Sequence, residues 1–210
     1  MNLEIIHVGL LGTNCYVCWD EDKNCVVVDC GGDADKVADF IREKGLTPTH
    51  LLLTHGHGDH MGGAADLKEI FPQIQIVLGE RDLEMIGDGE KSMSNAVAPY
   101  AKPFTPDILV KEGDQITSGN TVFTVMETPG HTPGGITYFK GNEMYCGDTL
   151  FQGSMGRTDL YGGDDTAMFA SLKRLGQLEG YYKVFPGHGS ATKLDDEKGA
   201  NPFLRRAIKM

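Results

Sequence analysis

The stretch Thr54-His55-Gly56-His57-Gly58-Asp59-His60 carries three imidazoles and one carboxylate within six residues. It directly follows the apolar run 51–53, which is typical of a short buried strand. Glycine at positions 56 and 58 allows a tight backbone, so several side chains can face one point. Imidazole and carboxylate groups are costly to bury unpaired, and they are ligands of divalent zinc, iron and manganese. The stretch therefore predicts a metal site just beyond the end of a strand.

Four other strand-like runs end in the same way, with a His or Asp in the turn that follows. They are run 26–28 before Asp29, run 123–127 before His131, run 144–146 before Asp148 and run 183–185 before His188. Turns at one edge of a sheet converge, and the sites of α/β folds lie there. These side chains are therefore expected to join the metal site. His7 and His50 lack this context and are expected to be structural.

Alternating strand-like and helix-like segments predict an α/β fold in one domain, residues 1–210. The expected helices are 33–44, with Asp33 as N-cap and Gly45 after its end, 62–71 and 166–178. Gly119-Asn120 and Gly141-Asn142 are typical of two-residue hairpin turns. The prolines and polar residues of 79–106 indicate a surface excursion. Few residues follow His188, so no separate C-terminal helical domain is expected.

Composition narrows the classes of function. The 210 residues include 30 acidic and 19 basic side chains, and the formal net charge of −11 disfavours binding to nucleic acid. No apolar run approaches the ~20 residues that a membrane helix needs. Five cysteines, an odd number, and an N-terminus without a signal-peptide pattern favour a reducing cytoplasm. Cys15 and Cys18 are spaced to face opposite sides of a strand, as small buried hydrophobic residues.

The histidine stretch, with Asp29 before it and His131, Asp148 and His188 after it, resembles the metallo-β-lactamase superfamily. The resemblance implies a four-layer αβ/βα sandwich, in which two mixed β-sheets are flanked by helices. It also implies two divalent metal ions. Zinc is the expected metal, and iron and manganese are the alternatives. One ion would be bound by His55, His57 and His131, the other by Asp59, His60 and His188, with Asp148 bridging them. Asp29 would support the histidine loop from behind.

Other segments are similar to glyoxalase II, the hydroxyacylglutathione hydrolases, and especially to short bacterial glyoxalase II-like hydrolases. The segments are Gly147-Asp148-Thr149-Leu150-Phe151, Gly153-Ser154-Met155-Gly156-Arg157-Thr158-Asp159 and Asn201-Pro202-Phe203-Leu204-Arg205. The resemblance implies hydrolysis of a small-molecule thioester by a metal-bound hydroxide, with Asp59 and Asp148 holding the catalytic ions. Arg157 and Tyr161 are candidates for binding the thiol carrier. The aspartate at position 148 argues against antibiotic hydrolysis as the native task.

Two other classes of protein remain open. Persulfide dioxygenases share the histidine motif and the Gly156-Arg157-Thr158-Asp159 segment, and they hold a single iron through two histidines and one aspartate. Here that iron would be bound by His57 or a neighbour, His131 and Asp148. Lactonases and phosphodiesterases are further metallo-hydrolases on the same scaffold. A purely structural zinc protein is disfavoured, because a structural site needs four ligands and this chain offers seven.

Overall fold

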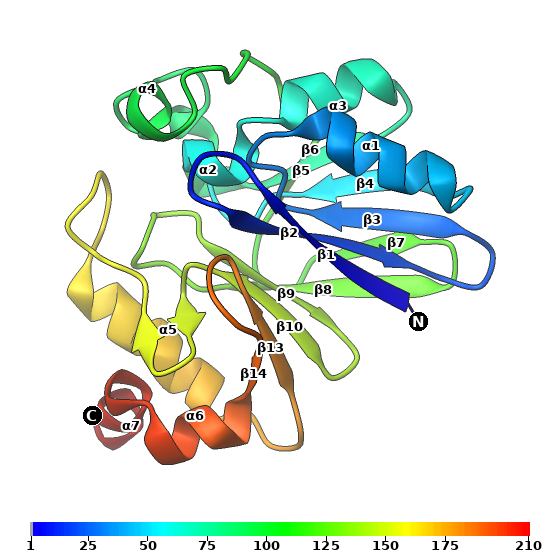
Figure 1. Ribbon diagram of the computed structural model, residues 1–210. Helices are drawn as coiled ribbons and strands as arrows, with labels where there is room; N and C mark the ends of the chain where they lie inside the picture. Colours follow the sequence, from blue (N-terminus) through cyan, green and yellow to red (C-terminus); the bar gives the residue numbers. More distant parts are fainter. Residues whose placement is uncertain (1) are drawn as a thin grey trace.

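The computed structural model describes residues 2–210 as two six-stranded β-sheets packed face to face, each covered on its outer side by helices (Figure 1). The first sheet has the strand order β1 to β6, with bounds Asn2–Val8, Thr13–Trp19, Asn24–Val28, Thr47–Leu52, Gln75–Gly79 and Ile108–Val110. The second has the order β14-β13-β10-β9-β8-β7, with bounds Thr192–Lys193, Lys183–Pro186, Glu143–Gly147, Ile136–Lys140, Thr121–Glu127 and Gln115–Ser118. A separate small hairpin is formed by β11 (Leu150–Phe151) and β12 (Ser154–Met155).

Helices form the two outer layers. The first sheet is covered by α1 (Ala34–Glu43) and α3 (Ala64–Ile70), and the second by α5 (Asp165–Gly176), α6 (Leu194–Ala200) and α7 (Pro202–Lys209) (Figure 1). Shorter helices lie in the loops: α2 (Gly58–Met61), the 3-10 helix η1 (Glu80–Met85) and α4 (Ser94–Val97). The four-layer sandwich expected from the sequence is confirmed.

Three hydrophobic clusters fill the spaces between the four layers. The first lies between α1, α3 and the first sheet and includes Val37 and Leu67. The second lies between the sheets, where the ring centroids of Tyr16 and Tyr145 are 5.4 Å apart in an edge-to-face contact. The third lies between the second sheet and α5–α7 and includes Leu172. Because both faces of each sheet are buried, apolar burial stabilises the whole stack.

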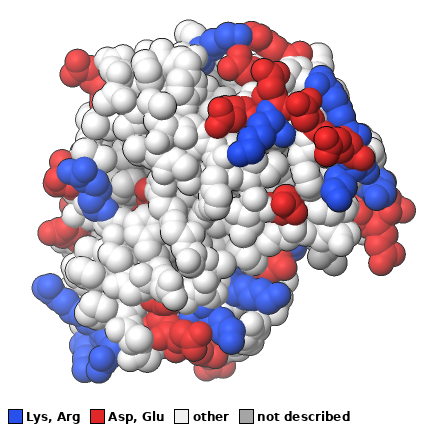
Figure 2. Space-filling model, in the orientation of Figure 1, with Lys and Arg blue, Asp and Glu red and all other residues white. Residues whose placement is uncertain are grey.

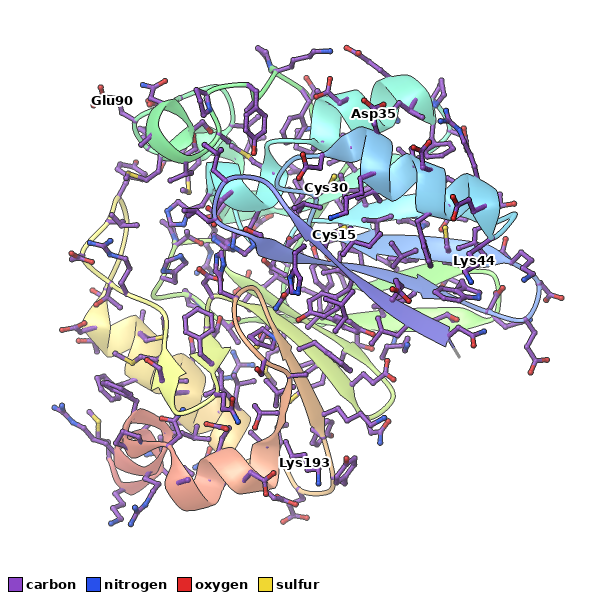
Figure 3. The ribbon with its side chains drawn as sticks, in the orientation of Figure 1. Cys15, Cys30, Asp35, Lys44, Glu90 and Lys193 are labelled. Carbon is purple, nitrogen blue, oxygen red and sulfur yellow. The ribbon has the colours of Figure 1, made fainter. Side chains whose placement is uncertain are left out.

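The cysteines belong to these cores. Cys15 packs in the first cluster and Cys18 in the second, so the two thiols of β2 point to opposite faces, as expected. Figure 3 labels Cys15 and Cys30 inside the molecule, near the first sheet and α1. All five cysteines are free and buried. Burial raises the pKa of the Cys18 thiol to about 11 and that of Cys25 to about 12.

Parallel pairing brings several candidate ligands to one edge of the sandwich. Strands β3 to β6 are parallel neighbours, as are β10 and β13, while the remaining neighbours are antiparallel. Asp29 follows β3, the histidine stretch follows β4, Asp148 follows β10 and His188 follows β13. Because parallel strands end on the same edge of a sheet, the turns after them lie together.

Several local predictions were wrong or incomplete. Asp33 precedes α1, but its side chain does not cap the helix; Asp33 Oδ2 accepts a hydrogen bond from Gly9 N at 3.0 Å instead. The expected helix 62–71 is present as α3, Ala64–Ile70, but the short helix α2, which begins inside the histidine stretch at Gly58, was not expected. Both two-residue turns are confirmed, at Gly119-Asn120 between β7 and β8 and at Gly141-Asn142 between β9 and β10. The elements not predicted from the sequence are β7, β11, β12, β14, α2, α6 and α7.

The connection from β5 to β6 leaves the sheet and contains η1 and α4 (Figure 1). Its outer side is exposed, as at Glu90, labelled in Figure 3. Its inner side is not, because Asp82, Met85, Ser92 and Ala98 are buried. This segment therefore packs against the rest of the molecule along part of its length.

The surface shows charges of both signs. On the face drawn in Figure 2, Lys and Arg side chains alternate with Asp and Glu at the upper right, over α1 and α3, and the middle of the face carries few charges. In the described part of the chain, no helix has the length and apolar character needed to span a membrane.

Candidate metal centre

Seven His and Asp side chains from four chain turns meet at this edge of the sandwich. They form three overlapping groups, and within each group one ligand atom of every residue lies within 4.8 Å of the others. The groups are His55, His57 and His131; His55, His60 and Asp148; and Asp59, His60 and His188. We call His55, His57 and His131 the first ligand group, and Asp59, His60 and His188 the second ligand group. All seven side chains singled out in the sequence are therefore brought together.

Asp148 lies between the two ligand groups. Its Oδ1 is 3.3 Å from His60 Nε2. Its Oδ2 is 3.6 Å from His131 Nε2 and 3.7 Å from His188 Nε2. The two oxygens of one carboxylate thus face nitrogens of both groups, which is the geometry that a bridging ligand needs.

Hydrogen bonds from behind fix which nitrogen of His131 and His60 carries the proton. His131 Nδ1 is 2.7 Å from the carbonyl oxygen of Arg157, and His60 Nδ1 is 2.8 Å from Asp29 Oδ2. Both oxygens can only accept, so each Nδ1 is the donor. In the neutral ring, Nε2 then presents its lone pair to the centre of the site. Metal-binding histidines are held by this kind of contact.

His55 is oriented through Thr54. The Thr54 hydroxyl donates to Asp29 Oδ2 at 2.8 Å, and it lies 3.0 Å from His55 Nδ1. Because its hydrogen is committed to Asp29, the Thr54 oxygen accepts from His55 Nδ1. His55 Nε2 is therefore also left with a lone pair. Asp29 thus contacts His60 directly and His55 through Thr54.

The donor set fits metal ions. His55 Nε2 and His57 Nε2 are buried and have no hydrogen-bond partner. His57 Nδ1 and His131 Nε2 face each other at 3.0 Å, and His60 Nε2 and His188 Nε2 at 3.3 Å. Buried polar atoms without partners are rare and unfavourable, and nitrogen lone pairs that converge in pairs attract a cation. The residues present therefore match divalent ions in both ligand groups.

Burial and charge together set the protonation of these side chains, and at His60, Asp59 and Asp148 the two effects oppose each other. Burial lowers the pKa of His55 and brings that of His57 to about 3, which keeps both rings neutral. His60 is also buried, yet the carboxylates of Asp148 and Asp59 raise its pKa. In return, His60 lowers the pKa of Asp59 and Asp148 against the effect of burial. The second ligand group thus contains one carboxylate, Asp59, and an imidazole, His60, that Asp59 and the neighbouring Asp148 make more basic.

The glycines of the histidine stretch serve a purpose other than the one expected. Gly56 and Gly58 do not adopt a positive φ, so residues with a side chain could adopt the same backbone conformation. A Cβ on Gly56 would lie 3.1 Å from Met85 Cβ, and one on Gly58 would lie 2.6 Å from Ser94 Oγ. Glycine is needed here because the 80–107 segment packs directly against the stretch. Close approach, rather than turn formation, explains both positions.

The centre opens to solvent at His188. The side chain of His188 is 28% exposed, whereas those of His60, Asp59, His131 and Asp148 are between 0% and 12% exposed. The ring of Phe151 stands edge-on to the His188 ring, with centroids 6.4 Å apart. Of these five side chains, His188 is therefore the one nearest to solvent.

Three supporting residues were missed by the sequence analysis. Thr13 Oγ1 donates to Asp59 Oδ2 at 3.4 Å. Asn14 Nδ2 donates to the carbonyl oxygens of Pro186 and Gly189, on either side of the loop that carries His188. Asp82 lies behind the first ligand group. Thr13 and Asn14 open a strand, and Asp82 follows one, so their position at strand ends was the only signal available.

The two candidates for substrate binding lie on the rim. The Arg157 guanidinium donates to both carboxylate oxygens of Asp159, at 2.6 and 2.7 Å, which lowers the pKa of Asp159 to about 2. The Tyr161 hydroxyl donates to Glu84 Oε1 at 2.8 Å, and Lys91 Nζ lies 4.8 Å from the centre of its ring. Both side chains are exposed but engaged, so an incoming carrier would have to compete with these contacts.

The fold and the ligand groups define a class of metalloprotein, and comparison with known families agrees. The sequence matches the Metallo-beta-lactamase superfamily over residues 8–188. The chain belongs to this superfamily, and the resemblance seen in the sequence is confirmed.

Individual relatives cover nearly the whole chain. Hydroxyacylglutathione hydrolase GloC of Haemophilus influenzae is 36% identical over 208 residues, which is 97% of this chain and 98% of the relative. The crystal structure of the B3 metallo-β-lactamase BLEG-1 superposes with a TM-score of 0.89 at 35% identity, over 97% of this chain and 99% of the other. TTHA1623 in a di-iron-bound form gives a TM-score of 0.84 at 35% identity, over 95% and 99%.

Proposed function

We propose that this protein is a metal-dependent hydrolase that cleaves small-molecule thioesters of the hydroxyacylglutathione type. The observation that carries the proposal is the pair of ligand groups joined by Asp148, at an edge that opens past His188. Similarity to hydroxyacylglutathione hydrolase GloC along almost the full length supports the choice of substrate class. The coarser statement, a hydrolase with a divalent-metal centre, follows from the superfamily and the donor set.

Two divalent ions bound here would supply Lewis acidity and lower the pKa of water toward about 7. The chain's own residues position and orient the ligand side chains. Asp148 faces both ligand groups, while Asp29 and the Arg157 carbonyl hold imidazoles with their lone pairs inward. No cysteine among the described residues is available as a nucleophile, since all are buried. A thioester suits such a site because thiolate is a good leaving group and needs little help to depart.

Zinc is proposed as the first metal, with iron or manganese as alternatives, because imidazole and carboxylate suit all three. Iron is kept as an alternative because the similar protein TTHA1623 has been crystallised in a di-iron-bound form. A cytoplasmic setting is proposed with the thioester substrate, because reduced thiol carriers belong to a reducing compartment.

The test is a substrate panel run with metal analysis on one preparation. The panel contains lactoylglutathione, glutathione persulfide, a lactone, a phosphodiester and, because of the BLEG-1 similarity, a β-lactam. We expect the highest kcat/KM for the thioester and about two metal ions per chain. Asp148→Ala is the matched inactive variant, and it should lose activity together with metal.

The panel also decides against the proposal if it is wrong. Oxygen consumption with glutathione persulfide, together with about one iron per chain, would replace it by the persulfide dioxygenase. A higher kcat/KM for the lactone, the phosphodiester or the β-lactam would keep the hydrolase and overturn the thioester. Full activity in Asp148→Ala would overturn the bridging position of Asp148.

A further inference from the structure

Asp82 is a buried carboxylate that belongs to neither ligand group. It lies on η1, just after β5, and its side chain is shielded from solvent. Its Oδ2 accepts from Gly56 N at 2.9 Å and from Thr132 Oγ1 at 2.7 Å, and its Oδ1 accepts from Gly134 N at 2.6 Å. A carboxylate without solvent is stable only when its oxygens are paired in this way.

The donors to Asp82 come from the two loops that carry the first ligand group. Gly56 separates His55 from His57, and Thr132 and Gly134 follow His131. The first loop extends from β4 of one sheet, and the second joins β8 to β9 of the other. One carboxylate therefore bridges two loops from different sheets, at the point where their histidines meet.

The first ligand group contains imidazoles only. No carboxylate among its three members attracts the others, and His57 Nδ1 faces His131 Nε2 at 3.0 Å across the loops. Other contacts join the two loops where they leave their strands: Ile136 N donates to Thr54 O at 2.8 Å, and the Tyr138 hydroxyl donates to Leu53 O at 3.0 Å. Asp82 joins the loops farther from the strands, through Gly56, Thr132 and Gly134, which neighbour the histidines in the sequence.

The second ligand group has other direct supports, although Asp29 also reaches His55 of the first group through Thr54. Asp29 holds His60, and Asn14 holds the loop of His188 through the carbonyl oxygens of Pro186 and Gly189. The Asp82 bonds go to the loops of His55, His57 and His131. A change at Asp82 should therefore act on one ligand group before the other.

We propose that Asp82 is a positioning residue for the first ligand group, which it holds at metal-binding spacing by bridging the His55–His57 loop to the His131 loop. The inference rests on the metal centre proposed above, and not on the choice of a thioester as substrate. It also assigns the 80–107 segment a part in building the site, since η1 carries Asp82.

Asp82→Asn is the test variant. Asparagine has the same shape, but only its amide oxygen can accept, so at least one of the three donated hydrogens loses its acceptor and faces an amide N–H group instead. We expect one of two bound ions to bind about 10- to 100-fold more weakly, the range found when partners of metal ligands are removed, while the other ion keeps its affinity. The measurement is a zinc titration of the metal-free protein in competition with a chelator, which needs no substrate.

Glu197→Gln is the matched control. Glu197 is also a buried carboxylate with three donors: Gly153 N at 2.7 Å, Thr192 Oγ1 at 2.8 Å and Asn201 Nδ2 at 3.0 Å. Its partners lie outside both ligand groups. We expect it to lower the free energy of unfolding of the metal-free protein as Asp82→Asn does, but to leave both zinc affinities unchanged. Equal weakening of zinc binding in the two variants would reduce Asp82 to a general structural residue and overturn the proposal.

Double variants identify the affected ion. Added to His188→Ala, Asp82→Asn should weaken the one remaining ion; added to His131→Ala, it should change nothing further. The reverse pattern, or an equal loss of affinity for both ions in Asp82→Asn alone, contradicts the proposal.

If Asp82→Asn does not fold, Thr132→Val removes one of the three donors and should show the same selectivity with a smaller fold-change. Wild-type protein that binds no more than one zinc would instead refute the two-ion centre itself.

Discussion

The carboxylate of Asp29 accepts two hydrogen bonds from Thr54, one from the backbone N–H and one from the hydroxyl, each 2.8 Å long. The same carboxylate accepts from His60 Nδ1, and the Thr54 hydroxyl oxygen accepts from His55 Nδ1. Asp29 has a φ of 55°, in the left-handed region. One residue in an uncommon conformation thus orients an imidazole in each ligand group.

Asp29→Asn should disturb both ligand groups. Asn also tolerates a positive φ, so the backbone is retained, but only its amide oxygen can accept, so at least one of the hydrogens donated by Thr54 N, the Thr54 hydroxyl and His60 Nδ1 loses its acceptor. We expect the metal-free protein to lose about 1–3 kcal/mol of unfolding free energy, the range for leaving buried donors unpaired. Both zinc affinities should fall, in contrast to Asp82→Asn. Urea unfolding and chelator competition measure the two effects, and unchanged zinc binding would remove Asp29 from its supporting position.

His131→Ala and His188→Ala should deplete different ions. His131 belongs to the first ligand group and His188 to the second, and the two rings come from separate loops. Each variant should retain about one ion per chain after dialysis against a chelator. With cobalt in place of zinc, the two variants should give different visible spectra, because the remaining ion has a different set of ligands. Identical spectra, or complete loss of metal from both, would favour a single-ion site.

Gly187→Ala should abolish metal binding by filling space. A Cβ at this position would lie 2.2 Å from Asp148 Oδ1 and 2.4 Å from His60 Cε1, closer than real contacts allow. Overpacking of this kind costs about 1–3 kcal/mol, and here it also displaces ligands. Gly199→Ala is the control, because Gly199 lies in α6 with no atom within 4 Å of the added methyl. It should bind metal normally, with stability unchanged or raised by up to about 1 kcal/mol.

Arg157→Ala tests carrier recognition. The guanidinium already pairs with Asp159 at an exposed position, so a carboxylate of the carrier gains little by replacing it. We expect KM for lactoylglutathione to rise only about two- to fivefold, with kcat little altered. Asp159→Ala should lower the same KM, since it frees the cation. A short uncharged thioester should show neither change, and equal effects on both substrates would refute the contact.

The cysteines should be unreactive in the folded protein. Burial raises the pKa of Cys18, Cys25 and Cys146 to about 11, 12 and 12, so little thiolate forms at pH 8. A thiol reagent should titrate fewer than about one thiol in the native state and all five after denaturation. Because these pKa values are raised above those of the unfolded chain, the unfolding free energy should be intact below about pH 8.5 and decrease as the pH rises through 11–12. Rapid labelling of the cysteines in the native protein would contradict this prediction, because it would show that the thiols are accessible to the reagent.

The fold class and the ligand types could be predicted because both depend on local patterns. Apolar runs of strand length ending in His or Asp are visible in the sequence, and the turns after such strands converge in α/β folds. Some elements were invisible for the same reason. In α6 only Leu194 and Glu197 are buried, so this helix shows no apolar stripe; α7 carries the apolar residues Phe203, Leu204, Ala207 and Ile208 on one face, but its eight residues give only a short signal. The strands β7 and β14 are too short to give a pattern.

The sequence by itself determined that imidazoles and carboxylates would gather at one edge of a mixed α/β sandwich. Only the tertiary structure decided which of them lie within reach of each other. His57 contacts His131 from 74 residues away, and Asp59 contacts His188 from 129 residues away. It also decided that Asp82 bridges the first ligand group and that Gly56 and Gly58 make room for a neighbouring segment. Such facts depend on distances between segments that meet only after folding, and no local pattern of residues records them.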